Sequence, residues 1–285
     1  MKRSASFPFL IFLSGVFFSC SDNKQKDQRL DLSPPYPDAE EQKIWEEQQK
    51  NGRSQSAEPF AVVELFSSEG CSDCPAAEEV LNRLTKDAIA DKSYVYPLAF
   101  HVDYWNKLGW KDVFSDSSYS NRQRKYRRSL GNEVVYTPQM IVNGLTEFTG
   151  SDEKRAHIVI DSVLKLKPEC YFTIHPSAVT SGDVTVNVEY EIIQFPARDK
   201  SMGFDICFAI VERGLQTHVG YGENVGKTLK HENVVRVFKS MELKEKTGTV
   251  ELSSFGKSPG GNHSLIVFVQ ERGNRKIIGA NLWNF

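Results

Sequence analysis

The sequence predicts an α/β domain followed by a small all-β sandwich domain of immunoglobulin-like type. Two observations lead to this fold class. Apolar runs of strand length alternate with helical patterns between residues 59 and 167, and short alternating segments with turn-rich gaps follow Pro168. The 285 residues, 40% of them hydrophobic and 25% charged, suffice for two such domains. We therefore expect domains at 59–167 and 168–285.

The α/β region is predicted in the order strand, helix, strand, helix, hairpin, helix. Pro75 favours the start of the first helix, and Gly131 favours the end of the second. Asn143 and Gly144 favour a tight turn inside the hairpin. The strands are expected at 61–66, 95–100, 139–142 and 145–149, and the helices from 75, at 119–130 and at 156–164. Seven further strands are expected at 171–174, 184–193, 205–212, 234–239, 248–252, 265–270 and 276–283.

The N-terminus predicts export from the cytoplasm. Lys2 and Arg3 precede a mostly apolar run at 7–18, which is too short to span a bilayer but suits a signal peptide. Ser19-Cys20 resembles a bacterial lipoprotein signal, so we expect a signal peptide at 1–19 and a lipid anchor on Cys20. A polar, proline-containing tether would follow at 20–58. These features predict an extracytoplasmic protein of the bacterial cell envelope, anchored in a membrane by lipid. A soluble secreted protein with an incidental Cys20 is the alternative.

The charge balance indicates no nucleic-acid partner. Lys and Arg number 35 and Asp and Glu 37, so the formal net charge is −2. A polyanion-binding protein would normally carry a basic excess.

Cys71 and Cys74 are the residues most indicative of chemistry. They lie in the segment Gly70-Cys71-Ser72-Asp73-Cys74-Pro75, between a predicted strand and a predicted helix. Helix N-terminal N–H groups favour a thiolate, and this spacing lets the second thiol resolve a mixed disulfide. Zinc ribbons also use Cys-x-x-Cys, but the sequence has no second pair at zinc-finger spacing. We expect a redox dithiol with no metal site and no cofactor, in which the negative charge of Asp73 opposes thiolate formation.

Several motifs resemble a known family. They are 62–66 (VVELF), 70–75 (GCSDCP), 100–105 (FHVDYW), 108–112 (LGWKD), 136–144 (YTPQMIVNG) and 150–152 (GSD). The chain resembles the secreted bacterial thioredoxin-like proteins catalogued as domain of unknown function 1223, strongly over 60–166 and more loosely to the end. The resemblance implies a thioredoxin-like fold for the first domain. It also implies that Thr137 and Pro138 form a cis-proline segment that docks substrate backbone beside the cysteines, although an ordinary trans proline is the alternative.

Other residues have competing interpretations. Glu64 is either a buried carboxylate that takes a proton during exchange or, more often for such a residue, a solvent-facing one. Four residues after the second strand are expected at the rim of a substrate groove: His101, Asp103, Trp105 and Trp110. For the two tryptophans, simple packing over a loop is an equally common role.

The C-terminal region offers weaker signals. His218 and His231 lack metal-ligand spacing and are expected in loops. The segment 222–228 fails the phosphate-loop pattern by one residue and is expected to connect strands of the sandwich. Whether Cys170 and Cys207 form a disulfide stays open.

The leading functional hypothesis is a membrane-tethered thiol–disulfide oxidoreductase of reductase or isomerase type. Cys71 would attack a protein disulfide of the envelope, Cys74 would resolve the intermediate, and Thr137-Pro138 would hold the substrate backbone. One alternative is a Cu(I)-binding metallochaperone that uses Cys71, Cys74 and His101. Another is a redox-silent, protein-binding lipoprotein.

Overall fold

The computed structural model describes residues 58–179, 185–196, 203–253 and 262–285. The predicted signal peptide, the lipid-attachment residue Cys20 and the tether as far as residue 57 lie outside these residues. Among the helices that are described, none is long and apolar enough to cross a membrane.

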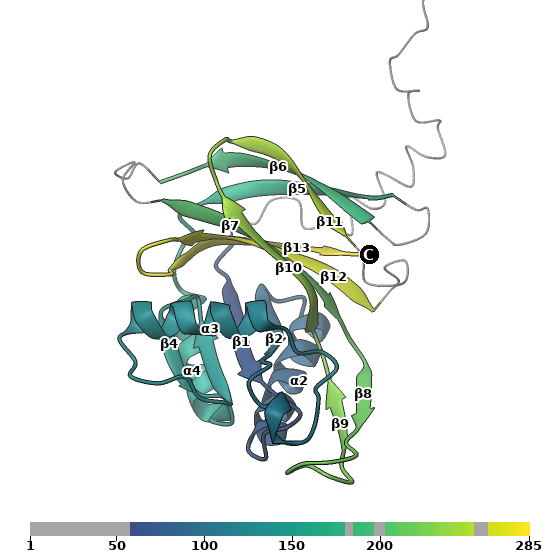
Figure 1. The fold of residues 1–285 in the computed structure, drawn as a ribbon. Helices are drawn as coiled ribbons and strands as arrows, with labels where there is room; N and C mark the ends of the chain where they lie inside the picture. Colours follow the sequence, from purple (N-terminus) through teal and green to yellow (C-terminus); the bar gives the residue numbers. More distant parts are fainter. Residues whose placement is uncertain (1–57, 180–184, 197–202, 254–261) are drawn as a thin grey trace, which may run out of the picture.

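The N-terminal half follows the predicted order of elements (Figure 1). Asp116 starts the second long helix by accepting a hydrogen bond from the backbone of Ser118, and Gly131 ends it with a φ of 73°. The turn residues Asn143 and Gly144 have φ values of 47° and 74°, which these two residue types tolerate. The elements are β1 (Ala61–Ser67), α2 (Cys74–Ala90), β2 (Val95–His101), η1 (Asn106–Leu108), α3 (Ser117–Leu130), β3 (Gln139–Val142), β4 (Thr146–Thr149) and α4 (Glu153–Val163).

The C-terminal half consists of strands. They are β5 (Tyr171–Val179), β6 (Thr185–Gln194), β7 (Phe204–Glu212), β8 (Leu215–His218), β9 (Thr228–His231), β10 (Val234–Glu242), β11 (Thr247–Ser253), β12 (His263–Glu271) and β13 (Ile277–Asn284). Four of them continue the sheet of the N-terminal half, giving eight strands in the order β13-β12-β7-β10-β2-β1-β3-β4. The others form a three-stranded sheet, β11-β6-β5, and a separate hairpin of β8 and β9.

The predicted fold class is therefore wrong. The molecule is not a compact thioredoxin-like α/β domain followed by a separate immunoglobulin-like sandwich, because one mixed sheet runs through both halves. Alternating apolar and polar residues indicate that a strand has a buried face, but they do not indicate which sheet the strand joins. The strands β7 and β12 are buried on both faces, as expected for central members of a larger covered sheet.

The two halves of the sheet meet where β10 begins beside β2. Val234 pairs with Ala99 in parallel orientation, and the Ala99 N–H donates to the Asn233 carbonyl at 3.0 Å. The Asn233 side chain also donates to the Pro97 carbonyl at 3.0 Å. Asn233 adopts a left-handed φ of 48°, a conformation that asparagine tolerates better than most residues. Asn233 thus contributes to this junction through both its backbone and its side chain.

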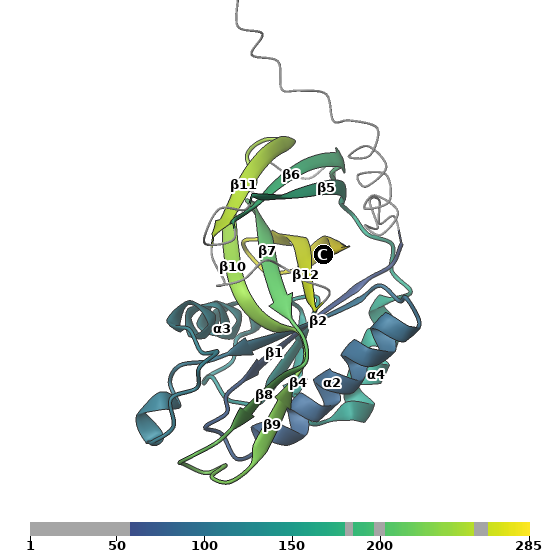
Figure 2. The ribbon, with the colours of Figure 1, turned by 90° about the vertical axis from the view of Figure 1, so that its right-hand side faces the viewer.

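Three apolar clusters pack against the sheet. Figure 2 shows the layers between which they lie, with β5, β6 and β11 over the C-terminal strands and with α3 on one side of the N-terminal strands and α2 and α4 on the other. The first lies between the three-stranded sheet and the C-terminal strands, and the third lies between α2, α4 and the N-terminal strands. The second lies under α3 and contains residues from both halves, among them Phe66, Phe100, Val235 and Phe268. Residues of β7 alternate between the first and second clusters, so this strand is a shared wall of two cores.

A buried ion pair fastens α3 to the centre of the sheet. The Arg122 guanidinium donates to both Glu64 carboxylate oxygens at 2.6 and 2.8 Å, and Tyr126 donates to Glu64 at 2.6 Å. Arg122 also reaches Gln270 of β12 at 3.3 Å and lies 4.7 Å from the ring centre of Phe238. Because these partners come from both halves of the chain, the ion pair couples α3 to the whole sheet.

We expect Arg122→Met to lower the free energy of unfolding by about 3–5 kcal/mol, because it leaves the Glu64 carboxylate buried without its counter-charge. Chemical denaturation measures this change. Arg124→Met, on the exposed side of the same helix, is the matched control and should change stability by less than about 0.5 kcal/mol. The double variant Glu64→Gln with Arg122→Met should be more stable than Arg122→Met alone. If Arg122→Met and the control Arg124→Met were equally stable, a structural role for the Glu64–Arg122 pair would be contradicted.

Candidate functional site

The two cysteines lie where the chain passes from β1 into α2. Cys74 is the first residue of the helix and Pro75 follows it, as the sequence predicts. Cys71 precedes the helix in a turn, in which its N–H donates to the Ser68 carbonyl and its own carbonyl accepts from the Cys74 N–H, each at 3.2 Å. All the cysteines in the described part of the chain are free thiols, including Cys170 and Cys207.

The two thiols differ in pKa and not in exposure. Both are almost inaccessible, since Cys71 is 2% and Cys74 1% exposed. A hydrogen bond from the Cys74 thiol, helped by Thr137 and by nearby backbone N–H groups, lowers the pKa of Cys71 to about 7 against the effect of burial. Burial, together with the bond to Cys71, raises the pKa of Cys74 well above its ordinary value. Cys71 is therefore the thiol that ionises first.

The Thr137-Pro138 segment lies against Cys71. The peptide bond between these residues is cis, which confirms the expectation from sequence. The Thr137 carbonyl lies 3.9 Å from the Cys71 sulfur, and the Trp105 indole donates to the Thr137 hydroxyl at 2.8 Å. Trp105 therefore fixes the segment beside the sulfur that ionises first.

The other predicted site residues are distributed differently from expectation. Trp110 is partly buried, and its indole donates to the Glu69 carboxylate at 2.8 Å. Asp103 is hydrogen-bonded to Ser120 of α3. His101 is fully buried and so does not form the rim of a groove. Glu64 is also buried, contrary to its more common solvent-facing interpretation, but its carboxylate lies under α3 with Arg122.

A buried cluster of histidines and carboxylates lies next to the cysteine turn. His101 Nδ1 lies 2.7 Å from the Asp112 carboxylate, and His101 Nε2 lies 3.6 Å from Glu78 Oε1. His231 is between two carboxylates, with Nδ1 3.4 Å from Glu78 Oε2 and Nε2 3.2 Å from Glu69 Oε1. Residues from α2, β2 and β9 and from two loops thus meet in one buried site.

The charges of this cluster stabilise one another. Burial alone would lower the pKa of His231, but Glu69 and Glu78 more than reverse this and raise it to about 10. Asp112 and Glu78 similarly raise the pKa of His101 despite its burial. The two histidines in turn hold the pKa of Glu78 below its usual value, although burial acts to raise it. The cluster therefore favours two imidazolium ions among three carboxylates.

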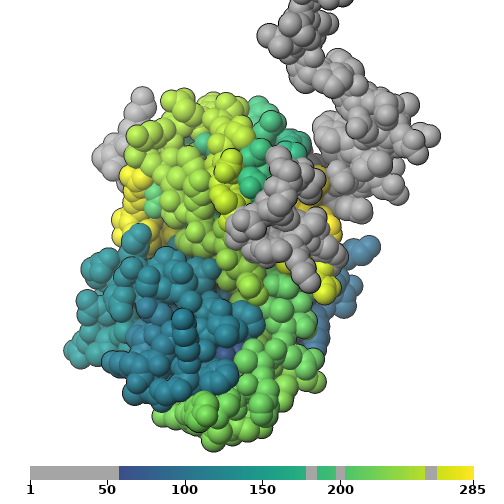
Figure 3. All heavy atoms as spheres, turned by 45° about the vertical axis from the view of Figure 1, so that its right-hand side comes forward, coloured from purple at the N-terminus to yellow at the C-terminus, as the bar shows by residue number. Residues whose placement is uncertain are grey.

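The β8–β9 hairpin covers the cysteine turn from the C-terminal half. The Asn224 amide donates to the Glu69 and Cys71 carbonyls, each at 2.8 Å, and the Ser72 N–H donates to Glu223 at 2.9 Å. Figure 3 shows the green atoms of this region in continuous contact with the blue atoms of the N-terminal half. The segment 222–228, which was expected to connect strands of the sandwich, therefore lies against the cysteine turn.

Sequence reasoning missed five residues of this site: Glu69, Glu78, Asp112, Asn224 and His231. Two of them are marked by motifs that carry the family resemblance, because Glu69 directly precedes GCSDCP and Asp112 is the last residue of LGWKD. No local pattern marks the others, because their partners lie up to 155 positions away in the chain.

Comparison with known proteins identifies the family. A family model described as "Protein of unknown function (DUF1223)" matches residues 62–270. The chain belongs to this family. No curated protein matches the chain.

Two solved structures have a similar fold. A protein of Agrobacterium tumefaciens is 27% identical, with a TM-score of 0.56 over 79% of this chain and 93% of its own. HBP35 of Porphyromonas gingivalis is 13% identical, with a TM-score of 0.54 over 81% of this chain and 76% of its own. At such low identity the second likeness concerns the fold alone.

We expect Asn224→Ala to loosen the cover of the cysteine turn, because two buried carbonyls lose their hydrogen-bond donor. The free energy of unfolding should fall by about 1–3 kcal/mol, and alkylation of Cys71 should become faster. Denaturation and timed iodoacetamide labelling measure the two effects. Val225→Ala, at an exposed position of the same loop, is the control. If both variants label at the wild-type rate, the hairpin does not restrict access to Cys71.

Proposed function

We propose that the protein is a thiol–disulfide oxidoreductase of reductase or isomerase type that acts through Cys71 and Cys74. The observation that carries the proposal is the pKa of about 7 for Cys71 beside a Cys74 whose pKa is raised. About half of the Cys71 would be thiolate at neutral pH, and the thiolate is the nucleophile in disulfide exchange. Similarity of the cysteine turn and the Thr137-Pro138 segment to thioredoxin-like proteins supports the same chemistry.

The reaction proceeds in two exchanges. The Cys71 thiolate attacks one sulfur of a substrate disulfide, which forms a mixed disulfide and releases the other substrate sulfur as a thiolate. Cys74 then attacks the Cys71 sulfur, its proton passes to the departing substrate thiolate, and the Cys71–Cys74 disulfide forms. Two electrons move from the protein to the substrate, and a dithiol reductant of the envelope returns them. In the isomerase direction the substrate's own thiol attacks the mixed disulfide and regenerates Cys71.

The two residues between the cysteines mark the side from which substrate approaches. Ser72 and Asp73 are exposed, whereas Trp105, Thr137 and Asn224 surround the turn elsewhere. Thr137 is placed to contact the substrate chain next to the reacting sulfur. The negative charge of Asp73 at this opening disfavours acidic substrate segments.

Glu64 has no part in this mechanism. Its carboxylate is held by Arg122 and Tyr126 under α3, and its neighbours on β1 face the opposite side of the sheet toward α2. The setting proposed for the enzyme is the cell envelope, with the protein attached to a membrane through Cys20. This part of the proposal is supported by the sequence of residues 1–20.

Alkylation against pH tests the proposal. In the reduced wild-type protein, iodoacetamide should label Cys71 first, with a half-maximal rate near pH 7, as read by mass spectrometry of the cysteine peptides. Cys74→Ser keeps a hydroxyl donor and should retain this midpoint. Cys74→Ala removes the donor and should move the midpoint up toward the ordinary value of about 8.5.

Trapping provides the second half of the test. Cys74→Ser should accumulate mixed disulfides with envelope proteins in cells, whereas Cys71→Ser should not. The buried thiols Cys170 and Cys207 serve as internal controls, since burial raises the pKa of each. A Cys71 midpoint near 8.5 in the wild type, with no trapped partner, would contradict the proposal and favour the redox-silent alternative.

A further inference from the structure

Two buried atoms beside the dithiol lack a close partner. Among the residues the structure describes, Glu78 Oε1 and His101 Nε2 are buried and make no hydrogen bond, and they lie 3.6 Å apart. The side chains themselves are almost wholly inaccessible, with His101 0%, His231 1% and Glu78 4% exposed. Buried polar groups normally have a hydrogen-bond partner, so these two atoms point to a ligand that bonds both.

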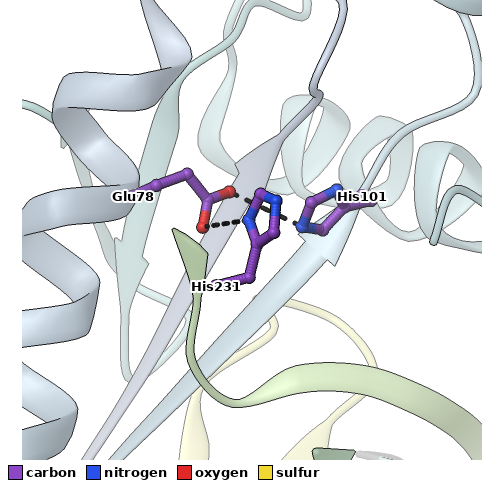
Figure 4. A group of neighbouring side chains, drawn as sticks. All are labelled: Glu78, His101 and His231. Carbon is purple, nitrogen blue, oxygen red and sulfur yellow. Dashed lines mark hydrogen bonds and ion pairs between the residues drawn. The ribbon is translucent and has the colours of Figure 1, made fainter. Parts of the chain in front are cut away.

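These three residues have the geometry of metal ligands. Glu78, His101 and His231 each offer one donor atom, and the three donor atoms lie within 4.8 Å of one another. Figure 4 shows both imidazole rings on one side of the Glu78 carboxylate, with an ion pair from the carboxylate to each ring. Its oxygens lie 3.6 Å from His101 Nε2 and 3.4 Å from His231 Nδ1. Ligands about 2.0–2.1 Å from a tetrahedral ion would be about 3.3 Å apart, so donor atoms separated by up to 4.8 Å would have to move closer together by up to about 1.5 Å.

The remaining nitrogen of each histidine faces a carboxylate. His101 Nδ1 lies 2.7 Å from Asp112, and His231 Nε2 lies 3.2 Å from Glu69. Metal-binding histidines almost always have such a partner, which fixes the tautomer and the ring orientation. The partners are themselves held in place, because Asp112 accepts from the Glu69 N–H at 2.9 Å and Glu69 accepts from Trp110 at 2.8 Å.

We propose that Glu78, His101 and His231 bind a divalent transition-metal ion, with zinc the best match to one carboxylate and two imidazoles. The proposal departs from the expectation of no metal site. The expectation that His231 is a loop residue is wrong, because it is the last residue of β9. Three protein ligands leave a fourth position for water or for another oxygen.

The proposed site differs from a cysteine-based copper site. No cysteine belongs to the three-residue donor group found in the described residues, so Cys71, Cys74 and His101 are not gathered as a Cu(I) site would require. Its ligands come from α2, β2 and β9, so ion binding would tie the hairpin that covers the dithiol to the rest of the sheet. The proposal is independent of whether the dithiol is redox-active.

Zinc titration of the purified, metal-depleted protein against a chromophoric chelator tests the proposal. One equivalent should bind to the wild type and to the double variant Cys71→Ser with Cys74→Ser. Binding should be lost in His231→Gln and Glu78→Gln, and Asp112→Asn should weaken it roughly 10–100-fold. His218→Gln changes an exposed histidine of the same hairpin and should bind as the wild type does. Circular dichroism confirms that each variant compared is folded.

Cobalt substitution identifies the ligands directly. Co²⁺ at this site should give visible d–d bands without the intense near-ultraviolet charge-transfer band of a cobalt–thiolate bond. Should Glu78→Gln fail to fold, the folded His231→Gln and Asp112→Asn variants decide the matter. The proposal fails if the wild type binds no stoichiometric zinc, if folded His231→Gln binds like the wild type, or if the cysteine double variant loses binding together with a thiolate band.

Discussion

The pairing of β10 with β2 is the constraint on which the rest of the structure depends. It rests on a short stretch in which Asn233 bonds to Ala99 and Pro97 and Val234 begins the ladder. Through this stretch the C-terminal strands extend the N-terminal sheet instead of forming a sandwich of their own. His231 lies two residues before Asn233, so the pairing that joins the sheet also brings this imidazole to α2 and β2. The covering hairpin is positioned by the same junction.

The site contains two neighbouring groups of side chains, the dithiol and the histidine–carboxylate cluster. The dithiol owes its asymmetry to local contacts, since Cys74, Thr137 and the start of α2 favour a Cys71 thiolate. The neighbouring cluster places five charged groups in the protein interior, where each needs the others to offset its desolvation. The Ser67 hydroxyl acts on both groups, because it lowers the pKa of Cys74 and of Glu78. The proposed metal site and the proposed dithiol site would therefore influence each other through Ser67.

The features that sequence predicted are those encoded locally. The Cys-x-x-Cys-Pro turn, the Asn143-Gly144 turn and the Gly131 stop each depend on the conformational preferences of adjacent residues. The cis bond before Pro138 followed from a motif whose residues are contiguous.

The features that sequence missed depend on distant pairing. Nothing near His231 indicates Glu78, which lies 153 positions earlier, and nothing near Asn224 indicates the cysteine turn. Glu64 shows the same limit. The apolar run at 61–66 predicts a strand, but whether the Glu64 side chain is buried depends on α3, which packs on that face. A strand that is buried on both faces, such as β7, follows the same apolar pattern whether its sheet has four strands or eight.

The most direct test of the central claim is the redox equilibrium of the wild-type protein in glutathione buffers of defined potential, with oxidised and reduced Cys71–Cys74 peptides counted by mass spectrometry. The account predicts one reversible two-electron transition confined to these two cysteines, with a tenfold change in their ratio for about 30 mV. Cys170 and Cys207 should stay reduced throughout. A pair that stays as two thiols across the whole range, or that forms only glutathione adducts without a Cys71–Cys74 bond, would contradict the account.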